Sequence, residues 1–156
     1  MHSRIYGIVR KDKEIYEEEK ESVLSLTDTE LHESMGGVAD YVTEDTDLKE
    51  DCEWLEENYG YMFEFTSENS FRLNKKEIGQ YLTEKINKLK EILNNTSTPN
   101  ELIKNTYNIK NLVDNEYEFY FVQGFNAETL DNFVKEEYLE EQDLEFEIVK
   151  TWDYHF

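Results

Sequence analysis

Apolar residues recur at helical spacing over 75–94, the longest amphipathic stretch of the chain. Asn74 precedes this stretch as a capping residue. The apolar stripe consists of Ile78, Leu82, Ile86, Leu89 and Leu93. After a polar break, Thr98-Pro99-Asn100-Glu101 combines a threonine cap, a proline in the first turn and a glutamate three residues after the cap. The two patterns predict consecutive helices.

Shorter patterns predict three further helices. One covers 47–58, where a single helical face carries Leu48, Cys52, Leu55 and Tyr59. The pair Thr27 and Glu30 matches a capping box and predicts a short helix that ends before Gly36. Asn126 is expected to cap another helix, whose apolar residues begin at Leu130.

Alternation of apolar and polar residues predicts strands in the remaining segments. These segments are 4–9, 38–42, 61–65, 71–73, 117–122 and 144–152. In the last of them, Phe146, Ile148 and Trp152 are expected on one face of the strand. The highly charged residues 12–22 are expected to form a turn or an exposed hairpin arm instead.

Short alternating strands interspersed with long helices are typical of an α+β fold. One-sided alternation favours a mixed or antiparallel sheet, of about four to six strands, with the helices packed mainly on one face. The length suits one domain, so the whole chain, 1–156, is expected to form a single acidic α+β domain.

Charge is the property that changes this picture most. The chain has 37 Asp and Glu against 16 Lys and Arg, a net charge of −21, although 14% of its residues are aromatic. The aromatic content argues against a disordered acidic tail. A folded domain with this charge is repelled by nucleic acid and by anionic membranes, and it is attracted to basic surfaces.

The location expected from the sequence is the cytoplasm. Cys52 is the only cysteine, so the chain cannot form an internal disulfide. The first ten residues lack the features of a secretion signal. No apolar run approaches the ~20 residues that a membrane helix needs.

No motif for catalysis, a metal ion or a cofactor stands out. Residues 45–56 partly match a calcium loop, but Glu50 stands where that loop needs glycine. A nucleophilic pair of Cys52 with His32 is disfavoured because Cys52 lies on an apolar helix face, where burial raises the pKa of a thiol. We therefore expect a binding protein that is not an enzyme and that uses no cofactor or metal.

The acidic residues suggest two candidate partner-binding surfaces. On the 47–58 helix, Glu50, Glu53, Trp54 and Glu57 lie off the apolar stripe. Tryptophan is enriched at binding hot spots, so Trp54 is a candidate anchor, although a large aromatic ring more often packs against a neighbouring segment. On the strands, Glu118, Glu145 and Glu147 lie opposite the aromatic residues and would line one face of the sheet.

In size, charge and aromatic content the chain resembles the small acidic phage proteins that inhibit restriction or CRISPR enzymes. The resemblance is one of type and covers no defined residues. It implies an inhibitor that occupies a basic, nucleic-acid-binding surface of another protein by mimicking DNA. The alternatives are an immunity protein or antitoxin for a basic nuclease, and a phage protein or enzyme whose charge is incidental.

The excess of negative charge predicts that salt stabilises the fold. Raising the salt to 0.1 M shortens the range of repulsion to about 10 Å, so the melting temperature should rise between very low and moderate salt at neutral pH. Calorimetry over this salt range measures the change. A melting temperature that stays constant would mean that the repulsion is already balanced by local ion pairs.

Overall fold

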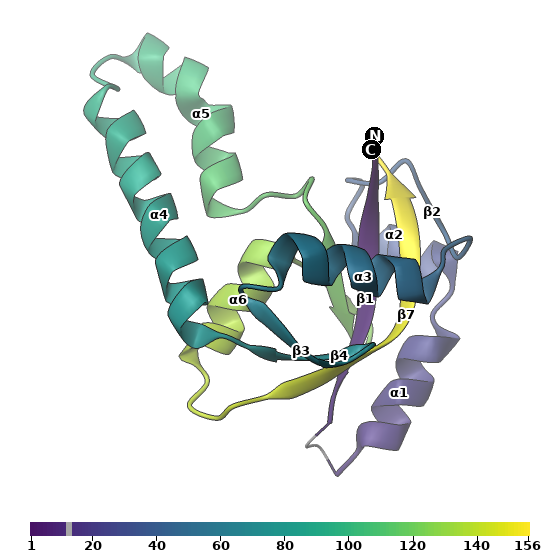
Figure 1. The fold of residues 1–156 in the computed structure, drawn as a ribbon. Coiled ribbons are helices and arrows are strands. Elements are labelled where there is room, and N and C mark those ends of the chain that lie inside the picture. The colour runs from purple at the N-terminus through teal and green to yellow at the C-terminus, as the bar shows by residue number, and fades with distance from the viewer. Residues whose placement is uncertain (12–13) are drawn as a thin grey trace.

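The computed structural model of the chain describes residues 1–11 and 14–156 (Figure 1). Within this described part, six helices accompany one seven-stranded mixed sheet, which confirms the predicted α+β class. The strands are β1 (His2–Arg10), β2 (Tyr41–Thr43), β3 (Phe63–Ser67), β4 (Ser70–Leu73), β5 (Tyr120–Gln123), β6 (Asn126–Thr129) and β7 (Glu145–His155). The helices are α1 (Tyr16–Ser25), α2 (Asp28–Ser34), α3 (Leu48–Tyr59), α4 (Lys75–Asn94), α5 (Pro99–Val113) and α6 (Leu130–Leu139).

Strand β1 occupies the middle of the sheet. The strand order is β3-β4-β7-β1-β5-β6, and β2 also pairs with β7. β1 runs antiparallel to β7, from the pair His2–His155 to the pair Arg10–Phe146, and parallel to β5 on its other side. The N- and C-terminal residues consequently meet at one end of the sheet (Figure 1).

Both faces of the sheet are buried. The larger core lies beneath α3, α6 and the first turns of α4, and it includes Tyr6 and Phe146. A second core lies beneath α1 and α2, and it includes Ile5, Val23 and Trp152. Helices α3, α4 and α6 therefore share one face, in line with the expectation that helices pack mainly on one side. The two N-terminal helices, α1 and α2, cover the other face of the sheet. The alternation within the strands did not indicate that this second face is buried.

A bulge in β7 explains why the alternating apolar residues of this one strand contribute to both cores. Gly7 of β1 pairs with Lys150, but the next residue of β1 pairs with Ile148, so Val149 is an extra residue in β7. The bulge reverses the direction of the following side chains. Ile148 therefore packs in the larger core, whereas Trp152 packs in the second one, and the expectation that they share a face is wrong.

Two local expectations are also wrong. Residues 16–25 form helix α1, not a turn or hairpin arm, because Val23 packs into the second core; residues 12 and 13 of that segment lie outside the described part. Residues 126–129 form strand β6, which pairs with β5 across a turn that contains Gly124 at φ 61°. Thr129 then caps α6 by accepting a hydrogen bond from the Asn132 amide.

The caps of the two longest helices are confirmed. The Asn74 side chain accepts a hydrogen bond from the Glu77 amide, and Thr98 and Glu101 form a capping box. Together α4 and α5 form a helical arm, residues 75–113, that projects from the sheet (Figure 1). Only Ile78 is buried on α4, and α5 has no buried residue.

Close packing at the centre of the sheet predicts that Gly7→Ala is destabilising. A Cβ atom at Gly7 would lie 2.6 Å from Cγ1 of Val23 and 2.9 Å from Cζ3 of Trp152. Overpacking of this kind should lower the free energy of unfolding by about 1–3 kcal/mol, measured by urea denaturation.

Gly79→Ala in α4 is the matched control. Its Cβ would meet only the hydroxyl end of the Tyr138 side chain, at 3.3 Å, which is free to move because Tyr138 is exposed. Alanine favours a helix over glycine, so this variant should gain up to ~1 kcal/mol. Equal losses in both variants would contradict the packing described around Gly7.

Candidate functional site

A cleft rich in carboxylates lies where the start of α3 meets the adjoining ends of β1 and β7. Its volume is about 280 Å³, and five of its nine lining residues are acidic. The acidic ones are Asp45, Asp47, Glu50, Asp51 and Asp153, and the others are His2, Ser3, Arg4 and Thr46. One arginine therefore faces five carboxylates. We refer to this cavity as the acidic cleft.

Local sequence signals place one side of the acidic cleft. Asp47 caps α3, because its Oδ1 accepts hydrogen bonds from the amides of Lys49 at 2.9 Å and Glu50 at 3.1 Å. Acidic residues in the first turn favour the helix because they complement its dipole. The loop before α3 is fastened to β7, since Thr46 Oγ1 donates to the Thr151 carbonyl at 3.1 Å.

Strand pairing places the opposite side. The register of β1 and β7 puts Arg4 across from Asp153. Nε of Arg4 donates to Oδ1 of Asp51 at 2.7 Å, and its guanidinium lies 4.4 Å from the centre of the Trp54 ring. Nδ1 of His2 contacts Oδ2 of Asp153 at 2.6 Å. Arg4 thus joins the floor of the cleft to α3.

The carboxylates exceed the cations that face them. Oδ2 of Asp51 is buried and has no hydrogen-bond partner among the described residues. Asp45 and Glu50 are exposed, and neither makes an ion pair within the described part of the chain. A cationic side chain entering the cleft would meet the exposed carboxylates of Asp45 and Glu50 at its rim. Such charge-assisted hydrogen bonds are the strong ones.

The predicted surface on α3 is only partly assembled. Glu50 lines the acidic cleft, whereas Glu53 and Glu57 lie on the exposed side of α3. Glu53 pairs with Lys49 at 3.7 Å. Trp54 is half-buried against the larger core, with Phe119 at 6.1 Å between ring centres. Trp54 therefore supports Arg4 and the core edge while its ring stays partly exposed, and its role as a partner anchor stays a prediction.

Glu118 lies before β5 and is held within the protein. Its carboxylate accepts hydrogen bonds from the Tyr59 hydroxyl and from Nδ2 of Asn115, the latter at 3.0 Å. Burial, together with the charge of Asp131, raises the pKa of Glu118. These contacts make its carboxylate a support for the end of α3.

Glu145 and Glu147 lie far from the acidic cleft, in ion pairs within the chain. Glu147 precedes Asp153 by six positions in β7, a distance of ~20 Å at the rise of a strand. Glu145 accepts hydrogen bonds from Thr66 at 2.7 Å, Lys11 at 3.1 Å and Arg72 at 3.1 Å. These contacts, that of Thr66 foremost, lower the pKa of Glu145 to about 2.

Glu147 is held in a similar way. It accepts hydrogen bonds from the Tyr16 hydroxyl and from Nζ of Lys20, the latter at 3.2 Å. Burial opposes ionisation of Glu147, but the hydrogen bonds from Tyr16 and Lys20 outweigh it and lower the pKa. Glu145 and Glu147 are thus both paired with cations of the same chain, and the partner-binding role of these residues stays a prediction.

Sequence reasoning missed Asp45, Asp51 and Asp153 as members of one site. Asp51 is on the apolar side of α3, next to Cys52, where an acidic residue signals a buried partner. That partner, Arg4, is brought in only by the strand pairing. The pattern of a single helix could have marked Asp51 as unusual, but it could not have placed Asp153 beside it.

Other chemistry finds little support in the described residues. Within 1–11 and 14–156, no group of three or more His, Cys, Asp or Glu could hold a metal ion. Cys52 is buried in the larger core, and burial raises the pKa of its thiol to about 12. His32 belongs to α2, on the opposite face of the sheet, so Cys52 and His32 do not meet.

No helix within residues 1–11 and 14–156 combines the length and apolarity that crossing a bilayer requires.

Comparisons of the chain with protein-family models, with curated proteins and with solved structures each found no match. The geometry and charge of the described residues therefore carry the functional argument alone.

The contacts of Glu145 predict a specific dependence of stability on pH. Its pKa is lower in the folded state than the ordinary value of 4.5, so its contribution to stability is present above about pH 4.5 and is lost as the pH falls toward about 2. Glu145→Gln should be less stable than the wild type near neutral pH, and this difference should shrink over that range.

Urea denaturation at a series of pH values measures the difference. Glu141→Gln is the control, because Glu141 is an exposed residue of the loop before β7 and should behave like the wild type. A difference for Glu145→Gln that does not change with pH would contradict the ion-pairing described here.

Proposed function

We propose that the protein is a binding protein that occupies a basic, nucleic-acid-binding surface of another protein, with the acidic cleft receiving a cationic side chain. The observation that carries the proposal is the cleft itself, in which five carboxylates face one arginine and the side chains of Asp45 and Glu50 are exposed. Carboxylates in this arrangement offer a partner the charge that it normally finds in phosphate groups.

The distribution of charge supports the proposal. The helical arm contains seven Lys and four Glu, which gives it a net charge of +3. Because the whole chain has a net charge of −21, the residues outside the arm have a net charge of −24. The acidic cleft belongs to this negative body. Such a field speeds the approach of a basic partner and repels nucleic acid itself. The proposed location is the cytoplasm, where a single reduced cysteine such as Cys52 is ordinary.

The test is a displacement assay. A partner is captured from host lysate at low salt and identified, and the fluorescence anisotropy of labelled duplex DNA or RNA bound to it is then followed. Added wild-type protein should release the nucleic acid while binding none of it directly. A partner that binds no nucleic acid, or one that retains it, would overturn the proposed function. A partner that is itself a toxic nuclease would identify the immunity-protein form of the same interaction.

The double variant Asp45→Asn/Glu50→Gln tests the cleft. Both residues are exposed at its rim, so the fold should be unchanged. We expect affinity for the partner to fall at least about tenfold, equivalent to ~1.4 kcal/mol. Glu140→Gln/Glu141→Gln removes the same charge from an exposed loop and should alter affinity much less. Equal losses in the two variants would show that net charge, and not the cleft, governs binding.

A further inference from the structure

Two histidines face each other at the end of the sheet where β1 begins. His2 of β1 lies directly opposite His155 of β7 in the antiparallel register. Opposed residues of neighbouring strands project from the same face of a sheet, and the two imidazole rings have their centres 5.0 Å apart. His2 is exposed and lines the acidic cleft, and His155 is half-buried. Solvent therefore reaches the pair.

Each imidazole is held through Nδ1 by a carboxylate of its own. Nδ1 of His2 lies 2.6 Å from Oδ2 of Asp153, and Nδ1 of His155 lies 3.1 Å from Oδ2 of Asp40. An ionised carboxylate can only accept a hydrogen bond, so each Nδ1 carries a proton and donates it. In the neutral ring the lone pair is then on Nε2. Histidines that bind metal ions have this arrangement, because the carboxylate fixes the tautomer and the orientation of the ring.

The contacts of Nε2 agree with this assignment. The backbone nitrogen of Met1 lies 3.2 Å from Nε2 of His155. That nitrogen can only donate, so Nε2 of His155 accepts the hydrogen bond and carries no proton. A metal ion on Nε2 would take the place of this contact, and Met1 can move aside because it is exposed. Nε2 of His2 makes no hydrogen bond within residues 1–11 and 14–156.

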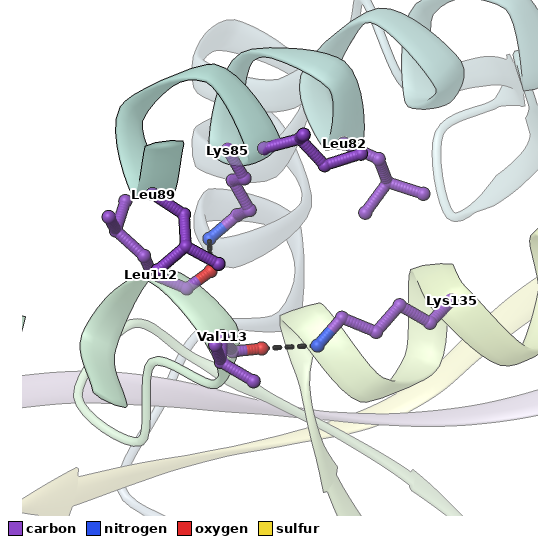
Figure 2. A pocket seen from close by; sticks show the side chains of 7 residues that line it. Leu82, Lys85, Leu89, Leu112, Val113 and Lys135 are labelled. Carbon is purple, nitrogen blue, oxygen red and sulfur yellow. Dashed lines mark hydrogen bonds between the residues drawn. The ribbon is translucent and has the colours of Figure 1, made fainter. Parts of the chain in front are cut away.

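The carboxylates around the two imidazoles lack a cation from the protein itself. In the part of the chain that the structure describes, no lysine or arginine pairs with Asp40 or Asp153, whose partners are the histidines. The base of the helical arm is different. There Nζ of Lys85 donates to the Leu112 carbonyl at 3.2 Å, as Figure 2 shows, and pairs with Asp131 at 3.0 Å. The end of the sheet therefore attracts a cation from solution.

We propose that His2 and His155 bind a divalent transition-metal ion through their Nε2 atoms. Two imidazoles that bind one ion at about 2.0–2.1 Å have ring centres roughly 4.5–5 Å apart, which matches the observed pair. Among the described residues, no third His, Cys, Asp or Glu completes the site, so water fills the other positions. Imidazole ligands suit zinc, nickel and copper, and copper(II) should bind most tightly.

The ion would join β1 to β7 at the end of their pairing. Because the two ligands are 153 positions apart in the sequence, only the folded chain brings them together. Binding should therefore stabilise the fold, and the melting temperature should rise with metal concentration. The site is independent of the inhibitory function proposed above.

Isothermal titration of the full chain with zinc chloride and with copper chloride, at about pH 7.5 where free imidazoles are neutral, tests the proposal. The wild type should bind one ion per chain. His2→Ala and His155→Ala should each weaken binding at least about tenfold, since even the loss of a residue that orients a ligand costs this much. His32→Ala is the matched control, because His32 lies on α2 with Nε2 on the Ala39 carbonyl at 2.9 Å, and it should bind like the wild type.

Nitrogen NMR of the histidine side chains identifies the atoms that bind. Zinc should shift the Nε2 signals of His2 and His155 and leave those of His32 unchanged. Circular dichroism checks the fold, and either ligand variant that folds is sufficient for the test because each removes a different ligand.

A wild type that binds no zinc or copper would overturn the proposal. So would unchanged affinity in His2→Ala or His155→Ala, because one imidazole of the pair would then be unnecessary. Displacement of zinc by a modest excess of magnesium, which prefers oxygen ligands, would assign the binding to carboxylates and also contradict the site. The displacement assay is run with a chelator present, so the two proposals fail separately.

Discussion

The antiparallel pairing of β1 with β7 is the interaction on which the rest of the structure depends. It places β1 in the middle of the sheet, where five consecutive residues, Ile5 to Val9, include four buried apolar side chains and Gly7. Their side chains alternate between the two cores, so one strand anchors helices on both faces. The same pairing sets Arg4 opposite Asp153 and so builds half of the acidic cleft. A change of register here would dismantle the cores and the cleft together.

Ion pairs resolve much of the repulsion that the composition implies. Lys11 and Arg72 meet Glu145, Lys20 meets Glu147, and Lys85 meets Asp131 in the interior. Asp131 is the most fully enclosed of these acids, because it also accepts hydrogen bonds from Tyr81 at 2.7 Å and the Asn115 amide at 2.8 Å. Several of the few cations are thus held where carboxylates support the fold, which leaves the acidic cleft with more carboxylates than cations. Breaking a buried pair such as Lys85–Asp131 is costly, so these cations are not available to neutralise the surface.

Local signals were sufficient wherever the cause of a structure is local. Asn74 and Thr98 marked the starts of α4 and α5, because a cap acts on amides within three residues of itself. The α+β class followed from the periods of the apolar residues. The bulge at Val149, strand β6 and the second core could not be predicted, since each depends on which strands become neighbours. The candidate site was also beyond local signals. Alternation showed which side of β7 carries Glu145 and Glu147, but it could not show that cations from other elements lie beside them. Helical spacing placed Trp54 off the apolar stripe of α3, but it could not show that Arg4 and Phe119 contact its ring.

The position of β1 has a consequence for how the chain is made. His2 contacts Asp153 across 151 residues, so the partner of β1 leaves the ribosome last of the described strands. At ordinary rates of synthesis, β1 waits on the order of ten seconds with an apolar surface on both sides. The hairpin of α4 and α5 needs only its own neighbouring residues and can form meanwhile. The segment 14–21, which follows β1, holds five Glu and one Lys, and its negative charge acts against association of this unfinished chain with others like it.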